Sequence, residues 1–155
     1  MFVSGIILAS GNSTRFGEDK LMQTLPNGKT VLEECISKFV EAGIFSELIL
    51  VNNPKSDLTS QLWLKKWNVK IVNGGSLRQE SAFCGVKATN INSEILCIHD
   101  AARPLVSIPL IKECVLKVEY VGACIPVLKV TDTIKEVINE RVTKTLDRDV
   151  LFKVQ

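Results

Sequence analysis

The sequence predicts an α/β fold in which a doubly wound, mostly parallel sheet carries helices on both faces. Short apolar runs, typical of strands buried on both sides, alternate along the chain with segments of helical spacing. Four such strand and helix units follow one another before the pattern changes near Val130. The 155 residues, 46% hydrophobic and 23% charged, have the length and composition of a globular protein, so we expect a single domain over 1–155.

The first strand is expected at 5–9, where the run Gly-Ile-Ile-Leu-Ala has no polar interruption. The first helix is expected at 30–42, because Thr30 and Glu33 match a capping box and apolar residues then recur at helical spacing. Gly43 is the type of residue that ends a helix. The first expected helix therefore has clear local signals at both ends.

The following units repeat the same alternation. Trp63 and Trp67, four residues apart, are expected to face the core with the intervening lysines in solvent, which is more common than a nucleic-acid-binding surface. Ser107 is expected to cap the last helix. The remaining strands are expected at 48–51, 69–72, 95–98 and 122–130, and the remaining helices at 56–67, 78–88 and 107–120.

The pattern after the fifth strand is different. Two β-rich segments, 131–137 and 142–147, are separated by a turn at Asn139 and Glu140. They predict a hairpin or β-arm over 131–147. No repeat, low-complexity tract or linker interrupts the chain.

Charge and hydropathy exclude several classes of function. Lys and Arg number 19 against 17 Asp and Glu, a net charge of +2 without a basic arm or acidic tail, so nucleic acid is not an expected partner. No run approaches the roughly 18 apolar residues of a membrane span. Met1 leads almost directly into a strand-like segment, so no secretory signal is expected. Five widely spaced cysteines without a CxxC pair are expected to be reduced, which favours a cytoplasmic protein.

The segments that follow the strands contain the candidate site, because ligands of an open parallel sheet bind beyond the carboxyl ends of its strands. After the first strand, residues 10–20 are rich in small and hydroxyl side chains and contain Arg15 and Lys20, a combination suited to binding phosphates. The spacing matches neither the dinucleotide fingerprint nor the Walker pattern. The alternative is a polar turn with solvated charges.

Two further segments follow the third and fourth strands. Asn73-Gly-Gly-Ser-Leu-Arg-Gln-Glu-Ser81 indicates a second ligand loop, although paired glycines before a helix also form simple turns. His99-Asp-Ala-Ala-Arg-Pro104 places Asp100 where a carboxylate can hold a phosphate-bound Mg²⁺, and Arg103 adds a cation. Asp100 as a turn cap is the alternative. The single histidine is expected to be packed or hydrogen-bonded rather than a zinc ligand.

After the fifth strand, Thr131-Asp-Thr-Ile-Lys135 and Thr145-Leu-Asp-Arg148 add hydroxyl and charged groups near the place of an acceptor. The sequence contains neither a Gly-x-Ser-x-Gly elbow nor a Cys/His pair, so these cations and carboxylates come without an activated nucleophile. That combination suits phosphoryl or nucleotidyl transfer, in which the protein mainly positions groups and neutralises charge.

Four motifs in this order resemble the 2-C-methyl-D-erythritol 4-phosphate cytidylyltransferase family of the non-mevalonate isoprenoid pathway, and the resemblance covers the whole chain. It implies a Rossmann-like nucleotidyltransferase fold and a reaction in which CTP and methylerythritol phosphate give the CDP-alcohol and pyrophosphate with Mg²⁺. The motifs are Gly74-Gly75-x-x-Arg78-Gln79-x-Ser81, His99-Asp-Ala-Ala-Arg-Pro104, Thr131-Asp-Thr-Ile-Lys135 and Leu146-Asp-Arg148.

The resemblance also implies a role for each site residue. The triphosphate would be contacted by Arg15 and Lys20, the catalytic pair that stabilises the pentacoordinate α-phosphorus. Asp100 would bind Mg²⁺ and the ribose or phosphate region, and Arg78 would lie beside the nucleotide pocket. The pocket for cytidine would be lined by Ala9, Ser10, Gly11, Gly75 and Ser81, and the methylerythritol phosphate would be held by Arg103, Thr133 and Arg148.

The sequence differs from the family pattern at two places. The loop from Arg15 to Lys20 is shorter, as in the molybdenum-cofactor nucleotidyltransferases, and the chain ends at Gln155 where the family continues with a segment that supplies another catalytic lysine. Two alternatives therefore stay open, a cytidylyltransferase for ribitol 5-phosphate and an inactive remnant that binds nucleotide or dimerises. The resemblance further implies a homodimer formed through the β-arm.

Overall fold

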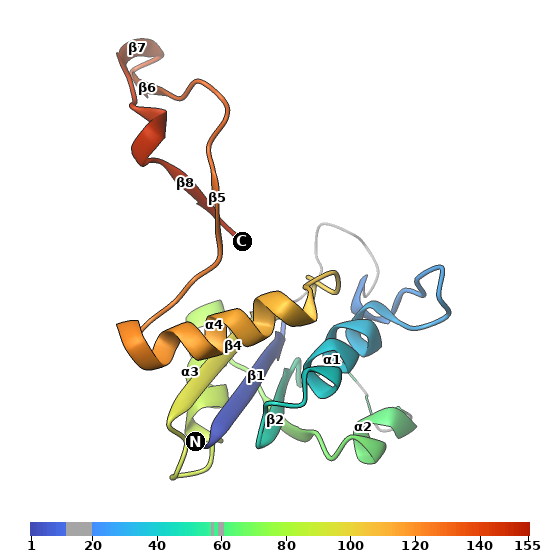
Figure 1. Cartoon of the computed structure of the whole chain (residues 1–155). Helices are drawn as coiled ribbons and strands as arrows, with labels where there is room; N and C mark the ends of the chain where they lie inside the picture. The colour runs from blue at the N-terminus through green and yellow to red at the C-terminus, as the bar shows by residue number, and fades with distance from the viewer. Residues whose placement is uncertain (12–19, 57, 59–60) are drawn as a thin grey trace. The chain divides into compact units, whose positions relative to one another are not determined.

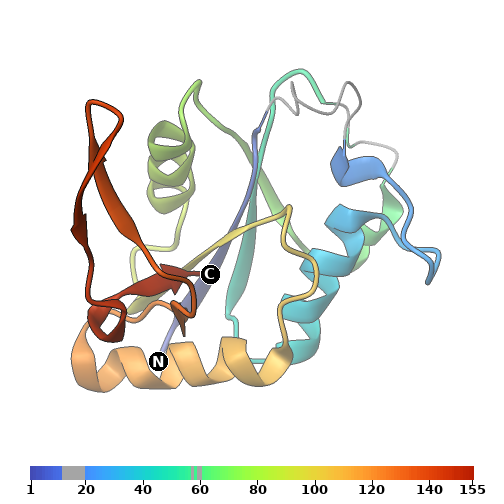
Figure 2. The same cartoon turned by 90° about the horizontal axis from the view of Figure 1, so that it is seen from above.

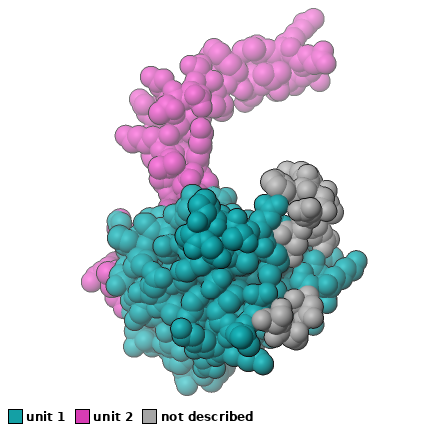
Figure 3. All heavy atoms as spheres, turned by 90° about the vertical axis from the view of Figure 1, so that its right-hand side faces the viewer, with its two compact units in different colours: residues 1–115 teal, residues 116–155 magenta. Residues whose placement is uncertain are grey.

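The structure, a computed structural model that describes residues 1–11, 20–56, 58 and 61–155, contains a parallel sheet of four strands. The described residues divide into two compact units, 1–115 and 116–155, shown in different colours in Figure 3. The four-stranded sheet belongs to the first unit. Its strands are β1 (Val3–Ala9), β2 (Glu47–Asn52), β3 (Lys70–Asn73) and β4 (Ile95–Asp100), in the order β3-β2-β1-β4.

The strand register brings the carboxyl ends of all four strands to one edge of the sheet. Ala9 pairs with Asn52, which in turn pairs with Asn73, and Leu8 pairs with Asp100. The chain leaves every strand at this edge, so the loops predicted to carry the site start side by side. The α/β class and the parallel arrangement expected from the sequence are confirmed.

Helices cover both faces of the sheet, as predicted. Against one face, Ile7 and Leu50 pack with Phe39 of α1 (Val31–Ala42) in the larger apolar cluster. Against the other, Ile6 and Val51 pack with side chains of α3 (Arg78–Lys87). Figures 1 and 2 show α1 and α3 on opposite sides of the sheet.

The ends of α1 confirm Thr30 as its N-cap and Gly43 as the residue that ends it. Thr30 Oγ1 accepts a hydrogen bond from the Glu33 backbone N–H at 3.1 Å, and Gly43 adopts the left-handed conformation with φ 64°. At the start of α4 (Ile108–Val121), the Ser107 hydroxyl accepts from the Leu110 N–H at 3.4 Å.

The helix expected at 56–67 is shorter than predicted. Among the described residues of that range, α2 covers Leu62–Lys66, while residues 56, 58 and 61 are not helical. Its N-cap, Gln61, makes no side-chain capping bond. Residues 57, 59 and 60 of the predicted helix lie outside the described residues. Trp63 and Trp67 do pack against the core, with ring centroids 5.4 Å apart, while the lysines between them are exposed.

The fifth strand is not the long parallel strand expected at 122–130. β5 covers only Val127–Lys129 and pairs antiparallel with β8 (Phe152–Val154) in the second unit. Pro126 immediately precedes it and has no N–H to donate to a ladder, which limits how early the strand can begin. The partner of this strand comes from the last residues of the chain, a pairing that the local pattern does not reveal.

The hairpin expected after it is present. β6 (Lys135–Ile138) pairs antiparallel with β7 (Arg141–Thr145), and Asn139 and Glu140 form the turn with positive φ values of 49° and 62°. Two positive φ values in a two-residue turn match the twist of a tight hairpin. Two short 3₁₀ helices complete the described structure, η1 (Lys20–Met22) and η2 (Arg148–Val150). Among the described helices, none is long and apolar enough to cross a membrane.

Candidate active site

Ser81 joins the loops that follow β1 and β3. The residue is buried, with 1% of its surface exposed. Its hydroxyl accepts a hydrogen bond from Ser10 Oγ at 2.7 Å and lies 3.2 Å from the Gly75 backbone N–H. It also reaches the Leu77 carbonyl at 3.0 Å, to which it can donate. Three residues assigned to the cytidine pocket, Ser10, Gly75 and Ser81, are therefore brought together although they lie up to 71 positions apart.

Gly74 allows the two loops to approach this closely. A Cβ at this position would lie 2.6 Å from Ser10 Cβ and 2.8 Å from Ser81 Oγ, distances that real side chains do not tolerate. The glycine is needed for contact between loops and not for an unusual backbone conformation. Ala9 is buried just before the junction and Gly11 is exposed just after it.

Glu80 is a site residue that the sequence reasoning missed. Its Oε2 accepts hydrogen bonds from the Ser76 N–H, the Ser76 hydroxyl and the Leu77 N–H at 2.8, 2.7 and 3.1 Å. Glu80 is the third residue of α3, the usual place for a capping glutamate. The position before the helix is Leu77, whose side chain cannot cap, so the usual sequence signature of such a cap was absent.

Asp100, at the end of β4, lies between two arginines. The Arg78 guanidinium donates to Asp100 Oδ1 from Nη2 at 2.9 Å and from Nε at 3.2 Å. Arg103 Nε lies 3.6 Å from the other oxygen, Oδ2. Both arginines were predicted from the sequence, and the structure places them on opposite oxygens of the same carboxylate. The Asp100 side chain remains 34% exposed.

Asp100 is suited to help hold Mg²⁺ but not to form a protein-only metal site. Within the described ranges, no group of three His, Cys, Asp or Glu side chains gathers as a metal site. Mg²⁺ commonly takes only one or two carboxylates from the protein, with phosphate oxygens and water as its other ligands. A partly exposed carboxylate between two arginines is compatible with that pattern.

His99 fixes the turn that carries these charges. Its Nε2 lies 3.0 Å from the Arg103 carbonyl oxygen, which can only accept, so Nε2 carries the proton. The imidazole packs against Phe39 with ring centroids 5.1 Å apart, and burial lowers its pKa. The expectation of a packed, hydrogen-bonded histidine is confirmed.

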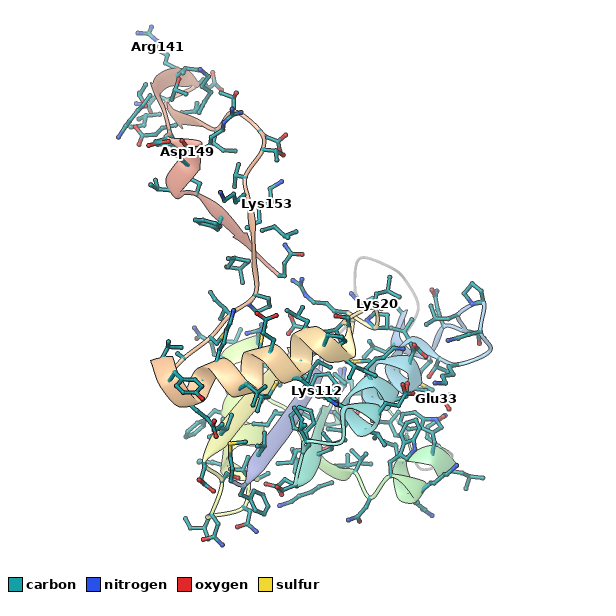
Figure 4. The ribbon with its side chains drawn as sticks, in the orientation of Figure 1. Lys20, Glu33, Lys112, Arg141, Asp149 and Lys153 are labelled. Atoms are coloured by element: carbon teal, nitrogen blue, oxygen red, sulfur yellow. The ribbon has the colours of Figure 1, made fainter. Side chains whose placement is uncertain are left out.

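The predicted catalytic pair falls partly inside the described structure. Lys20 begins η1 with an exposed side chain, labelled in Figure 4, and the next residue, Leu21, is buried in the core. Arg15 lies outside the described residues. Cys35 and Cys97 are not candidates for a nucleophile, since burial raises the pKa of Cys35 to about 12 and that of Cys97 to about 11.

Two of the residues assigned to the acceptor, Thr133 and Arg148, belong to the second unit. Arg148 Nη1 donates to the Thr131 carbonyl at 3.1 Å, and the Leu146 N–H donates to the Ile134 carbonyl at 2.9 Å. The segment that contains Thr133 therefore runs beside the one that contains Arg148. Arg103, the third residue of the acceptor set, belongs to the first unit.

A model of the 2-C-methyl-D-erythritol 4-phosphate cytidylyltransferase family matches residues 3–155. The chain belongs to this family. Among curated members, it is 36% identical to the bifunctional enzyme IspD/IspF of Dinoroseobacter shibae over 155 residues, which are 99% of this chain and 38% of that protein. It is 35% identical to the cytidylyltransferase of Dictyoglomus thermophilum, covering 99% of this chain and 69% of that protein.

Solved structures of cytidylyltransferase family members have the same fold. The 4-diphosphocytidyl-2C-methyl-D-erythritol synthase of Anaerococcus prevotii matches with a TM-score of 0.87 and 28% identity, covering 99% of this chain and 68% of that one. The 2-C-methyl-D-erythritol 4-phosphate cytidylyltransferase of Thermus thermophilus matches with a TM-score of 0.77 and 27% identity, covering 100% of this chain and 68% of that one. The Rossmann-like nucleotidyltransferase fold implied by the resemblance is confirmed.

Proposed function

We propose that this chain is a cytidylyltransferase that transfers CMP from CTP to 2-C-methyl-D-erythritol 4-phosphate and releases pyrophosphate. The family match over residues 3–155 carries the proposal. The cluster of Arg78, Asp100 and Arg103 at the carboxyl end of the sheet supports it, because nucleotidyl transfer needs cations and a carboxylate at that edge.

The reaction requires no nucleophile from the protein. A phosphate oxygen of methylerythritol phosphate attacks the α-phosphorus of CTP, and a new P–O bond forms as the bond to the β-phosphate oxygen breaks. Pyrophosphate leaves with that electron pair. Lys20 and Arg15 neutralise the negative charge that develops on the pentacoordinate phosphorus, and this electrostatic stabilisation supplies most of the catalysis.

Mg²⁺ belongs to the same proposal. When bound, it neutralises phosphate oxygens and orients the triphosphate for in-line displacement. Asp100 would hold it together with phosphate and water oxygens. Arg78 contacts Asp100 in the structure, so its guanidinium would compete with Mg²⁺ for this carboxylate.

In the second unit, Thr133 and Arg148 would contact the acceptor phosphate. Arg148 is held by the Thr131 carbonyl, two residues before Thr133, so this hydroxyl and this guanidinium are presented by neighbouring segments. Guanidinium groups suit a phosphate monoester because their planar donors match two of its oxygens.

The proposal includes a homodimer formed through the β-arm and a cytoplasmic location. Apolar side chains of the hairpin are more than half exposed, namely Val137, Ile138 and Val142, which supports burial against a second copy. The five cysteines, all in the described part of the chain, carry free thiols, which is typical of a reducing compartment.

An assay that compares acceptor substrates tests the activity. Pyrophosphate release from Mg²⁺-CTP is measured with methylerythritol phosphate, with ribitol 5-phosphate and without acceptor. We expect turnover with the first, and a loss of roughly 10³-fold in kcat for Lys20→Ala, because a cation on the transition state is removed. Lys65→Ala, an exposed lysine of α2, is the matched control and should leave turnover unchanged.

Each alternative has its own outcome. Preferential turnover of ribitol 5-phosphate would favour the related sugar-alcohol enzyme. Stabilisation by Mg²⁺-CTP in a thermal melt without turnover of either acceptor would favour an inactive nucleotide-binding protein. Full activity in Lys20→Ala would contradict the proposed mechanism.

A further inference from the structure

One carboxylate oxygen of Glu80 organises the loop between β3 and α3. It accepts from the Ser76 hydroxyl, the Leu77 N–H and the Ser76 N–H, and these three bonds lower the pKa of the carboxyl group. Glu80 is therefore ionised at neutral pH. An exposed negative charge in the first turn of α3 is therefore hydrogen-bonded to a loop assigned to nucleotide binding.

This charge changes what the start of α3 can bind. Unpaired amides at a helix N-terminus bind phosphates, because they are donors at the positive end of the helix dipole. Here the Ser76 and Leu77 amides are already occupied by a carboxylate of the chain itself. A ligand phosphate at this place would meet a negative charge, so the loop is suited to an uncharged part of the nucleotide.

The carboxylate also strengthens two acceptors of the loop. The Ser76 N–H shares its peptide group with the Gly75 carbonyl, and the Leu77 N–H shares its own with the Ser76 carbonyl. A hydrogen bond from an amide to an anion polarises the peptide group and increases the negative charge on its carbonyl oxygen. Both carbonyl oxygens therefore become better partners for a donor such as an amino group.

These peptide groups adjoin the contact between Ser10, Gly75 and Ser81. A Cβ at Gly75 would collide with Glu80, with Oε2 at 2.7 Å, so the glutamate side chain folds directly over this residue. Gly75 in turn donates its N–H to Ser81 Oγ at 3.2 Å, which joins it to Ser10. The charge is thus built into the segment assigned to the cytidine pocket.

We infer that Glu80 is a positioning residue that makes this loop prefer a nucleobase with an exocyclic amino group over one with a carbonyl oxygen at the same place. The inference rests on the proposed function, since the base must lie at this loop. An amino group would meet polarised acceptors, whereas a carbonyl oxygen would be repelled by them and by the carboxylate.

Binding of CTP and UTP distinguishes this role from a merely structural one, because the two nucleotides differ in an amino and a carbonyl group. Affinities are measured by titration calorimetry with Mg²⁺ present for the wild type, Glu80→Gln and Glu80→Ala. Gln retains an acceptor for the loop amides and removes the charge. We expect the CTP-over-UTP ratio to fall about tenfold in Glu80→Gln, with an unchanged thermal midpoint.

Glu33→Gln is the matched control, because Glu33 is the third residue of α1 as Glu80 is of α3. It should leave the ratio unchanged. Glu80→Ala removes charge and acceptor together, so it should lower the ratio and also weaken CTP binding as the loop opens.

The outcomes separate this inference from the proposed function. A wild-type protein that binds neither nucleotide contradicts the proposed function. A wild-type protein that binds CTP and UTP equally overturns the inference alone. Equal losses for both nucleotides in Glu80→Gln, with the ratio preserved to within about twofold, also overturn it.

Discussion

Arg78, in the first turn of α3, contacts one oxygen of Asp100 through two guanidinium nitrogens, at 2.9 and 3.2 Å. The pair joins the first turn of α3 to the end of β4. Its side chains are 67% and 34% exposed, so it contributes little to the stability of the fold. Its importance lies in the site, where the carboxylate proposed to hold Mg²⁺ already has a cationic partner.

We expect Arg78→Gln to lower the Mg²⁺ concentration needed for half-maximal CTP binding by about twofold to fivefold, because an exposed ion pair competes with the metal by less than about 1 kcal/mol. Titration of Mg²⁺ at fixed CTP measures this concentration. Lys87→Gln removes a cation near the other end of the same helix and should leave it unchanged. An increased Mg²⁺ requirement in Arg78→Gln would contradict the competition.

Ser81→Ala should weaken both the nucleotide pocket and the fold. The substitution leaves Ser10 Oγ and the Gly75 N–H without their shared partner, so the free energy of unfolding should fall by about 1–2 kcal/mol and CTP affinity about tenfold. Denaturant unfolding and calorimetry measure the two effects. Ser37→Ala removes another buried hydroxyl, which donates a hydrogen bond to the Glu34 carbonyl in α1. It should lower the free energy of unfolding without changing CTP affinity.

Gly85 sets the distance between α3 and the sheet. A Cβ there would lie 2.5 Å from Ile6 Cγ2 and 2.9 Å from Val51 Cγ2, both in the buried core. We expect Gly85→Ala to lower the free energy of unfolding by about 1–2 kcal/mol, because overpacking outweighs the helix propensity that alanine adds. Gln79→Ala, on an exposed position of the same helix, is the control. A more stable Gly85→Ala protein would show that the helix can move away from the sheet.

Glu34 should make the fold sensitive to acid. Lys38 contacts its Oε1 at 2.9 Å and Lys29 its Oε2 at 3.3 Å, and these bonds, with Lys38 foremost, hold the pKa of the carboxyl below its ordinary 4.5. The Glu34 carboxyl binds a proton less tightly in the folded state than in the unfolded state. The stabilisation that its contacts with the two lysines give the fold is therefore complete above pH 4.5. It is lost as the pH falls through the folded-state pKa.

The pH dependence is measured by denaturant unfolding between neutral and acidic pH. Glu34→Gln should be less stable than the wild type at neutral pH, and the difference should shrink as the pH falls below 4.5. Glu41→Gln is the control, because this half-exposed carboxylate lies 4.0 Å from Lys29 and should matter little. A Glu34→Gln deficit that stays constant with pH would assign the effect to packing.

Local signals were sufficient for much of the fold. The capping residues Thr30 and Gly43, the apolar run of β1 and the turn at Asn139 and Glu140 all act within a few residues, so their effects can be predicted from neighbouring positions. The partner of β5 could not be predicted in this way. Strand pairing depends on which segments meet in space, and β8 lies more than twenty residues further along the chain.

The same distinction holds for the site. Residue types and their place after strands determined that cations, a carboxylate and glycines gather at one edge of the sheet, because parallel strands end together. Only the tertiary structure decided that Arg78 and Arg103 lie on opposite oxygens of Asp100, that Ser10 bonds Ser81, and that Glu80 closes its own loop. Hydrogen bonds require distances and directions that the order of residues does not specify, and these contacts form only once the sheet has set the register of its loops.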